Sequence, residues 1–471
     1  GMIAIYRVEL SFAVQTSRAR KPIVDEQFTA RAMIGTRMVV ASPRSSKAVT
    51  PKTTDTQPSA PFYWPAGTSS TAKPRQTQIT DLREQIWSWM FDNALPFWAA
   101  NGVDTVNGGF VEQLTLDGRD AAATFKRTRV TARQVYVFSH ARLLGWDDAG
   151  GAARSGIDFL INRTWQGTSG GFARTASRNG DVLDPTLDLY DHAFVLFAFA
   201  WRHRAEGDSL SRDWMHRTLD FIETRFRHPG GEGFWHEFPP AGYRLQNPHM
   251  HLTEGCLAAF ESTGEARFAE ASGRLVALFQ NHLFDRATGT LREYYDDSWR
   301  PAPGEKGREV EPGHMLEWAW ILNQARKLIN VDTGDDIRAL VAFAEQHGAD
   351  PVSGATYNAV RDDGLPLDRG SRIWPNTERI KAAIALHESA GVDPWPVIAQ
   401  SSQLLLSRYL GREPAGTWMD AFDAAGQQAA KVVPASSLYH LFMAFTEVLR
   451  ISAPEQAAPV ETPDTRNRRT I

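Results

Sequence analysis

The sequence predicts an all-α fold, an (α/α)6 barrel of twelve helices with short β-hairpins between helix pairs. Helix-length amphipathic segments alternate with short Gly-rich connections, and the connections recur about every sixty residues. A period of this length is typical of repeat architectures, in which neighbouring units bury one another's apolar faces. Six such units therefore indicate one closed ring of helices and not a series of separate domains.

Twelve segments have the length and the apolar periodicity of helices. In chain order they cover 79–100, 129–145, 151–164, 187–204, 210–227, 248–262, 265–282, 311–330, 334–348, 374–390, 393–409 and 434–451. The eighth has a clear start signal, because Pro312 stands in the first turn, where its missing N–H costs no hydrogen bond. In a ring of this kind we expect the even-numbered helices to line the inside and the odd-numbered helices to cover the outside.

The repeat is clearest in the segments that connect the helices. Most have a turn glycine close before an apolar anchor, followed by a second turn signal such as Asp117-Gly118 or Asn179-Gly180. The anchors stand at intervals of 62, 62, 57, 66 and 61 residues, and they are Phe110, Phe172, Phe234, Leu291, Tyr357 and Trp418. We expect a small hairpin at each of these six places.

The two ends of the chain differ in composition from the repeats. The run 41–78 is rich in Ser, Thr, Pro, Lys and Ala and has little periodicity. We therefore expect three parts. These are a low-complexity, largely disordered extension over 1–77, a barrel domain that carries the site over 78–452, and a flexible tail over 453–471.

Composition excludes several classes of function. A net charge of −4 gives no strong attraction to nucleic acid, and no apolar run approaches the ~18–20 residues of a membrane span. No Gly-rich phosphate loop opens a helix after a strand. The single cysteine, Cys256, permits no intrachain disulfide and fits a buried thiol in a reducing compartment, so we expect a cytoplasmic protein.

Ionisable residues recur near the N-terminal ends of the even-numbered helices. They stand 59, 59, 63, 64 and 62 residues apart, close to the period of the hairpins, and they are Arg133, His192, His251, His314, Glu378 and His440. Buried charge is costly without a partner, so packing alone does not explain six such groups at one end of one ring. The sequence therefore predicts a polar cavity there. Trp374, close to Glu378, either stacks on a substrate or only packs.

Two of the histidines precede a carboxylate by three residues on the same helix face, His251 before Glu254 and His314 before Glu317. Di-iron bundles use the opposite order, Glu-x-x-His. The chain also has no His-Glu-x-x-His motif and no cysteine cluster. We therefore predict that the site uses no metal and no cofactor.

The residue types in this set indicate a chemistry. Glycoside hydrolysis needs two placed carboxylates as its main actors, whereas histidines dominate here. The pKa of histidine lies near neutrality, which suits reversible removal of a proton beside a carbonyl group. The enediolate that forms needs a fixed cation such as Arg133, and a glutamate beside each histidine would orient its ring. These residues predict aldose–ketose isomerisation or 2-epimerisation of a sugar.

Three motifs are distinctive: Asn-Pro-His-Met-His-Leu-Thr-Glu at 247–254, Glu-Pro-Gly-His-Met-Leu-Glu-Trp at 311–318 and Trp-Pro-Asn-Thr-Glu at 374–378. With 131–138 and 438–440, they resemble the N-acylglucosamine 2-epimerase superfamily, which includes cellobiose 2-epimerases, mannose isomerases and sulfoquinovose isomerases. The resemblance implies an (α/α)6 barrel in which His314 and His440 are the acid/base pair and Glu317 tunes His314. The expected substrate-binding residues are Arg133, His251, Glu254, His192, Trp374 and Glu378.

The sequence leaves open which reaction the protein catalyses. The residues of the motifs at 311–318 and 374–378 are similar to those of isomerase-like bacterial members. We therefore expect an isomerase that converts a mannose-type aldose into a ketose. The alternatives are a 2-epimerase of N-acylglucosamine or another sugar, a glycoside hydrolase on the same barrel, and a sugar-binding protein without turnover.

The expected substrate is a monosaccharide or disaccharide. A phosphorylated sugar would need additional cations at the mouth of the site, for which Arg129, Arg372 and Arg379 are candidates. The resemblance also implies a homodimer, and we expect no nucleic-acid or membrane partner.

Overall fold

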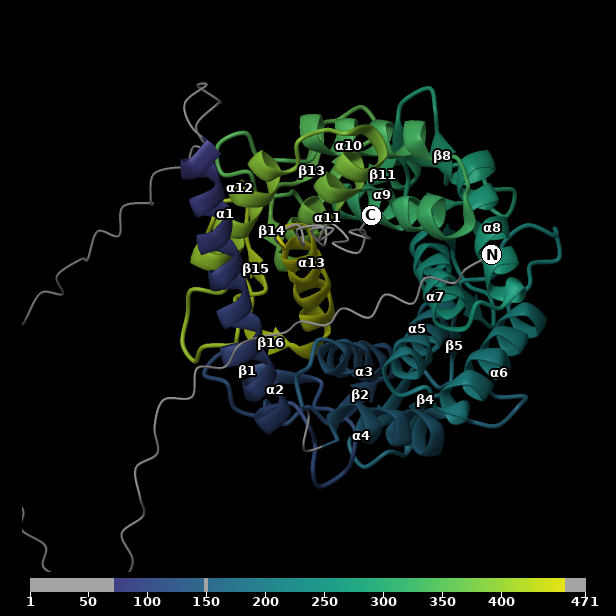
Figure 1. Ribbon diagram of the computed structural model, residues 1–471. Helices are drawn as coiled ribbons and strands as arrows, with labels where there is room; N and C mark the ends of the chain where they lie inside the picture. The colour runs from purple at the N-terminus through teal and green to yellow at the C-terminus, as the bar shows by residue number, and fades with distance from the viewer. Residues whose placement is uncertain (1–71, 148–150, 454–471) are drawn as a thin grey trace, which may run out of the picture. The chain divides into compact units, whose positions relative to one another are not determined.

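The computed structural model describes residues 72–147 and 151–453, which belong to one compact unit of the chain (Figure 1). Within these residues twelve helices form two concentric layers, as predicted. The predicted extension over 1–77 and tail over 453–471 lie outside the described residues, except for 72–77 and Ala453. The first helix includes 72–77, and the division into three parts stays a prediction.

Six helices form a closed inner layer. Each contacts the next around the ring, and the last contacts the first. They are α3 (Thr128–Leu143), α5 (Leu189–Glu206), α7 (Asn247–Thr263), α9 (Pro312–Ile329), α11 (Ile373–Ala390) and α13 (Leu438–Ile451).

The outer layer covers this ring. It consists of α1 (Ala72–Trp87) with α2 (Leu95–Asn101), α4 (Ala152–Phe159), α6 (Ser209–Arg225), α8 (Ala266–Leu278), α10 (Gly334–His347) and α12 (Trp395–Leu404). A π-helical segment, Ser88–Ala94, joins α1 to α2, so the two are one continuous helix. Outer and inner helices alternate along the chain, which confirms that the even-numbered predicted helices line the inside.

Burial explains why the helices separate into layers. In α3 every residue from 130 to 139 is buried, because this helix has neighbours on all sides. In α8 one stripe, formed by residues such as Phe268, Leu275 and Leu278, faces inward and the opposite side faces solvent. None of the helices in the described ranges is long and apolar enough to cross a membrane.

Short antiparallel strands join each repeat to the next. The strand before an inner helix pairs with a strand of the following repeat. The pairs are β2 (Phe125–Arg127) with β3 (Thr175–Ser177), β5 (Leu187–Asp188) with β6 (Glu237–Phe238), β7 (Arg244–Leu245) with β10 (Tyr294–Tyr295), β11 (Glu309–Val310) with β12 (Ala359–Arg361), and β14 (Ser371–Arg372) with β15 (Ala421–Phe422). β16 (Val432–Pro434) pairs with β1 (Gln113–Thr115) and closes the ring.

Local hairpins and turns lie where the sequence predicts them. β3 pairs with β4 (Val182–Asp184), β12 with β13 (Pro366–Asp368), and β8 (Phe284–Asp285) with β9 (Thr290–Leu291). The predicted anchors Phe110, Phe172, Phe234 and Leu291 each bridge to the residue seven positions earlier. Gly171 shows why glycine precedes an anchor, since its φ is +62° and a Cβ there would lie 2.5 Å from the Phe221 ring.

Candidate active site

A cavity of about 240 Å³ lies where the six inner helices begin. The electropositive N-terminal ends of these helices favour negative charge at this end of the ring. All six contribute to the lining, which comprises Arg133, Tyr190, Asn247, His251, Glu311, His314, Glu317, Arg372, Trp374, Asp420, Ser436, Ser437 and His440. Six of the nine predicted site residues therefore line one cavity, and Glu254, Glu378 and His192 do not.

His314 lies in the first turn of α9, and its Nδ1 is hydrogen-bonded to Glu293 Oε2 at 3.0 Å. Glu311 Oε2 lies 3.8 Å from the same nitrogen. Burial lowers the pKa of His314, but the negative charges of Glu293 and Glu311 outweigh burial and raise it to about 9. His314 is therefore an imidazolium at neutral pH and can donate a proton.

Glu293 itself is firmly held. It lies in the segment between β9 and β10, is buried, and accepts a hydrogen bond from Gln246 Nε2 at 2.9 Å. Gln246 in turn accepts from the indole N–H of Trp318 at 2.7 Å. This chain of hydrogen bonds fixes the carboxylate that orients His314, so the ring of His314 has one defined orientation.

His440 lies in the first turn of α13, and its Nδ1 is 2.7 Å from Glu378 Oε1. Burial lowers the pKa of His440, and the positive charges of Arg133 and Lys381 lower it further, to well below its ordinary value. His440 is therefore neutral at pH 7 and can accept a proton. Because Glu378 engages Nδ1, Nε2 is the ring nitrogen left to react with a substrate.

Trp374 lies against both histidines. Its ring centroid is 5.1 Å from that of His314 and 5.4 Å from that of His440. Gly313 leaves room for the indole, since a Cβ at this position would lie 2.5 Å from the Trp374 ring. The half-buried indole thus forms an apolar face in the cavity with a protonated and a neutral histidine beside it.

Glu317 lines the cavity close to His440, with Oε1 4.0 Å from His440 Nδ1. Burial raises the pKa of Glu317 well above its ordinary value, and the charge of Glu378 raises it further. These effects favour a protonated carboxyl group that can donate a hydrogen bond to a substrate oxygen. The direct partner of His314 is Glu293 and not Glu317, so a tuning role for Glu317 acts through space only.

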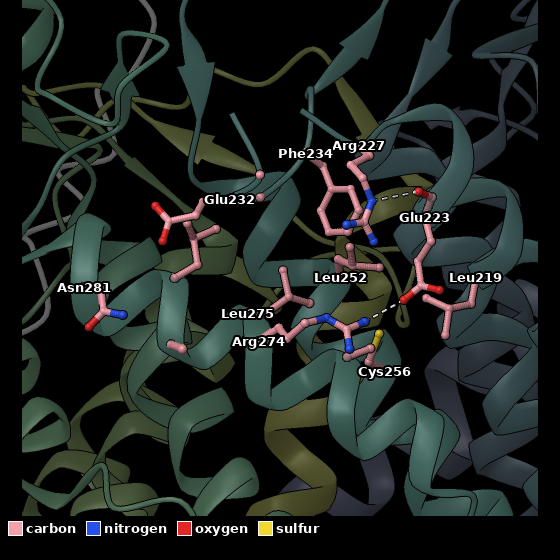
Figure 2. A pocket seen from close by; sticks show the side chains of 15 residues that line it. Leu219, Glu223, Arg227, Glu232, Phe234, Leu252, Cys256, Arg274, Leu275 and Asn281 are labelled. Atoms are coloured by element: carbon pink, nitrogen blue, oxygen red, sulfur yellow. Dashed lines mark hydrogen bonds and ion pairs between the residues drawn. The ribbon is translucent and has the colours of Figure 1, made fainter. Parts of the chain in front are cut away.

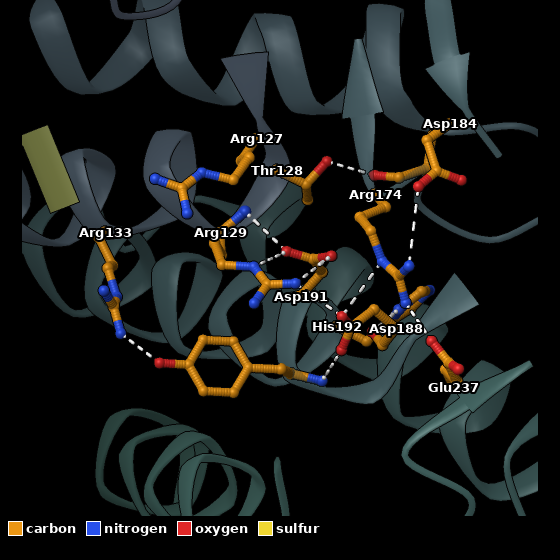
Figure 3. Close-up of polar contacts among 12 residues, drawn as sticks. Arg127, Thr128, Arg129, Arg133, Arg174, Asp184, Asp188, Asp191, His192 and Glu237 are labelled. Carbon is orange, nitrogen blue, oxygen red and sulfur yellow. Dashed lines mark hydrogen bonds and ion pairs between the residues drawn. The ribbon is translucent and has the colours of Figure 1, made fainter. Parts of the chain in front are cut away.

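Arg133 supplies the cation that the chemistry requires. Its Nη2 donates to the hydroxyl of Tyr190 at 2.5 Å (Figure 3). Its guanidinium lies 4.3 Å from the centroid of the Phe194 ring and 5.1 Å from that of Tyr439. Aromatic surroundings do not neutralise the guanidinium as a carboxylate would, so its charge can stabilise an oxyanion in the cavity.

His251 and Glu254 form a third pair of histidine and carboxylate. His251 Nδ1 is 3.1 Å from Glu254 Oε2, and both Glu254 oxygens lie 2.7 Å from the hydroxyl of Tyr439. His251 lines the cavity, whereas Glu254 is buried beneath it. Glu254 and Glu378 thus each contact a histidine, and neither is among the residues that line the cavity.

His192 lies outside the cavity, contrary to our expectation that it binds substrate. Its Nδ1 is 2.7 Å from the carbonyl oxygen of Asp188, and its Nε2 accepts the backbone N–H of Phe172 at 3.0 Å. The ring is completely buried and stacks on Phe221. Both nitrogens therefore hold the backbone of its own repeat in place.

The same role recurs in two other repeats. His249 Nε2 accepts the N–H of Phe234 at 3.0 Å, and Asn376 Oδ1 accepts the N–H of Thr356 at 2.9 Å. His192 is thus equivalent to His249 and not to His251, two residues further along α7. Two residues rotate a side chain by about 200° around a helix, which turns His192 away from the cavity.

Among the residues that the structure describes, three groups of side chains at this end of the ring bring ligand atoms within 4.8 Å of one another. They are His251 with Glu254 and Glu317, His314 with Glu293 and Glu311, and His440 with Glu317 and Glu378. In each group the histidine Nδ1 is already hydrogen-bonded to a carboxylate. A cation bound there would displace the contacts that orient the histidines, and the metal-free site stays a prediction.

A second cavity of about 230 Å³ lies between α6, α7 and α8 (Figure 2). Its lining includes four leucines, an ion pair of Arg274 and Glu223, and the side chain of Cys256. Burial raises the pKa of the Cys256 thiol to about 12, so the thiol stays protonated. This agrees with the predicted plain buried thiol.

Comparisons with known proteins place this site in a family. Residues 108–444 match the family model of N-acylglucosamine 2-epimerase. A mannose-6-phosphate isomerase of Rhizobium meliloti (strain 1021) is 36% identical over 377 residues, which are 77% of this chain and 96% of that protein. A D-mannose isomerase of Thermobifida fusca is 28% identical over 59% of this chain and 72% of its own length.

A solved structure agrees in fold. The cellobiose 2-epimerase from Spirochaeta thermophila DSM 6192 has a TM-score of 0.70 and 24% sequence identity, and it covers 81% of this chain and 99% of its own. The family match spans the hairpins and the inner helices that carry the cavity. The chain therefore belongs to the N-acylglucosamine 2-epimerase family, whose members are sugar isomerases and epimerases.

Proposed function

We propose that this enzyme is a cofactor-free isomerase that converts a mannose-type aldose into its ketose. Neutral His440 takes the proton from C2 of the open-chain sugar, and Arg133 stabilises the oxygen that becomes negative in the enediolate. The proton returns to C1 while the hydroxyl proton of O2 passes to O1, which gives the ketose. The observation that carries this proposal is the pairing of one neutral and one protonated histidine beside Trp374.

A 2-epimerase uses the same intermediate and differs in the last step. If His314 delivered a proton to C2 from the opposite face, the product would be the epimeric aldose. Identity to a mannose-6-phosphate isomerase, at 36%, and to a D-mannose isomerase, at 28%, supports the isomerase over the epimerase.

A glycoside hydrolase is less well supported by the contacts of the carboxylates. Of the carboxyl groups that line the cavity, Glu311 pairs with Arg372 at 3.1 Å, Asp420 accepts from the Ser437 hydroxyl at 2.5 Å, and Glu317 lies 4.0 Å from His440 Nδ1. Such carboxylates orient other side chains, whereas hydrolysis requires two that face the glycosidic bond.

We also propose that the substrate is an unphosphorylated sugar. Arg129 is bound to Asp191 and Asp188 at 2.8 and 2.6 Å (Figure 3). Arg379 is buried against Glu345 at 2.7 Å, and Arg372 lines the cavity but shares its charge with Glu311 at 3.1 Å. A phosphate group would have to compete with a carboxylate for each of these three cations.

A panel of sugars tests the proposal. Metal-depleted enzyme would be incubated with mannose, mannose 6-phosphate, N-acetylglucosamine and cellobiose, and products would be identified by NMR. We expect fructose from mannose, with kcat/KM at least about tenfold above that for mannose 6-phosphate, since loss of charge complementarity costs about 1.4 kcal/mol or more. Glucose as the product would establish a 2-epimerase instead. Preference for the phosphate ester, or activity only after a metal is added, would contradict the corresponding part of the proposal.

The homodimer and the cytoplasmic location also remain proposals. The first rests on the family resemblance, and the second rests on the single cysteine.

A further inference from the structure

Lys381 is a buried lysine whose position the reaction described above leaves unexplained. It lies on α11, one turn after Glu378, and its side chain is 0% exposed. Its Nζ is 2.7 Å from Glu378 Oε2, 3.4 Å from Met443 Sδ and 4.5 Å from the centroid of the Trp320 ring. A buried ammonium group is costly, so a role in packing alone does not explain it.

The surroundings of Lys381 carry several charges. Burial lowers the pKa of Lys381, but its ion pair with Glu378 on α11, together with the nearby carboxyl groups of Glu317 on α9 and Glu254 on α7, outweighs burial and raises it. Lysine is therefore charged here. Burial raises the pKa of each of these three carboxyl groups, and the charge of Lys381 is the largest effect that lowers it. The other titratable groups around this centre include Arg133 and Tyr136 on α3, Tyr190 on α5, His251 on α7, His314 on α9, and Tyr439 and His440 on α13.

Glu378 is the carboxylate that Lys381 touches directly. Its Oε2 contacts Lys381, and its Oε1 contacts His440 Nδ1 at 2.7 Å. An ionised Glu378 can only accept, so it holds the proton of His440 on Nδ1 and leaves a lone pair on Nε2. A protonated Glu378 could donate to Nδ1 instead, and the proton of the imidazole would then sit on Nε2, where it blocks the base.

We propose that Lys381 is a positioning residue that keeps Glu378 ionised and thereby holds His440 in the Nδ1–H tautomer, with Nε2 available as the base. This inference rests on the proposed function of His440. Lys381 contacts no substrate in this account. It sets the tautomer of His440 through one carboxylate, and its charge also lowers the pKa of His440 directly. The ion pair of Lys381 and Glu378 therefore contributes to catalysis, although neither residue lines the cavity.

The tautomer can be measured without a substrate. Protein labelled with ¹⁵N in its histidines would be compared as wild type and Lys381→Met, and the His440 signals would be assigned by their absence in His440→Gln. We expect a protonated Nδ1 and a bare Nε2 in the wild type, and a loss of that tautomer in Lys381→Met. An unchanged Nδ1–H tautomer in Lys381→Met would overturn the proposal, whatever the sugar activity turns out to be.

Kinetics give a second readout. We expect kcat of Lys381→Met to fall on the order of 10²-fold at pH 7 with little change in KM, because a wrong tautomer alone costs up to ~10⁴-fold in a histidine base. Without Lys381 the pKa values of Glu378 and His440 both rise, so the acidic limb of the pH profile moves to higher pH. Lys126→Met is the matched control. It removes another buried lysine, paired with Asp104 at 3.0 Å, and leaves the acidic limb in place.

A double variant covers the case in which Lys381→Met does not fold. Glu378→Gln and Lys381→Met/Glu378→Gln both lack the carboxylate through which Lys381 acts, and the double variant has no unpaired buried charge at this pair. We expect equal kcat for the two at pH values above their acidic limbs, because the direct charge of Lys381 on His440 shifts only the limb. A further tenfold loss in the double variant would show that Lys381 acts by another route and would overturn the proposal.

Discussion

We expect His440→Gln to lower kcat by about 10³-fold, because general acid–base catalysis by one positioned group contributes ~10²–10⁴-fold. Glutamine keeps a polar side chain beside Glu378 but has no lone pair of useful basicity. KM should change little, since the loss is in the transition state and not in sugar binding. The measurement is steady-state conversion of mannose at pH 7.5, with circular dichroism to show that the variant is folded.

His192→Asn is the matched control for that experiment. His192 is also a buried histidine on an inner helix, but its nitrogens hold the backbone, as the amide of Asn376 does in its own repeat. We expect this variant to keep kcat within about threefold of the wild type. A wild-type kcat in His440→Gln would remove His440 from the mechanism, and a large loss in His192→Asn would reverse our correction of its role.

The second large effect is expected for Glu293→Gln. The proposed function rests on a protonated His314 that can donate a proton in the cavity, and Glu293 contributes most among the carboxylates that raise its pKa to about 9. In the wild type activity should persist up to about pH 9 and fall as the pH rises through that value. In the variant the pKa of His314 moves down towards the ordinary histidine value of about 6.5, so the alkaline limb shifts to lower pH.

The pH profile of kcat measures this shift. At pH 8.5 we expect kcat to be about threefold lower than in the wild type for a pKa change of one unit, and more than about tenfold lower for a change of two units. Glu311→Gln is the control, since Glu311 lies 3.8 Å from Nδ1 and not in hydrogen-bond contact, and its limb should shift less. An unchanged alkaline limb in Glu293→Gln would show that the charge of His314 does not govern that limb.

The ring of twelve helices was predictable because the period is long and the anchors are strong. The six predicted anchors lie in connections between helices, at the intervals that the sequence indicated, and Pro312 begins α9 as expected. The pairing of strands between repeats was not predicted. Strands of two or three residues carry too little alternation to reveal their partners, so the closure of the ring by β1 and β16 came only from the structure.

The spacing of the repeat selected positions that face the cavity for three histidines, because His251, His314 and His440 all line it. At His192 the spacing was two residues off, so the side chain of His192 points to the hairpin of its own repeat and not into the cavity. Glu293 was missed because it lies outside the helices, 21 residues before His314, where no helical spacing marks it. Lys381 was missed because a lysine on an apolar helix usually faces solvent, and only its burial reveals its pairing.

The most direct test of the central claim is proton NMR of mannose with metal-depleted wild-type enzyme in D₂O. A histidine that removes the C2 proton exchanges it with solvent, so the account predicts deuterium at C1 of at least part of the fructose formed. It also predicts no exchange with His440→Gln. Fructose that forms over many turnovers without any deuterium would mean that hydrogen moves directly from C2 to C1, and the histidine mechanism would be wrong.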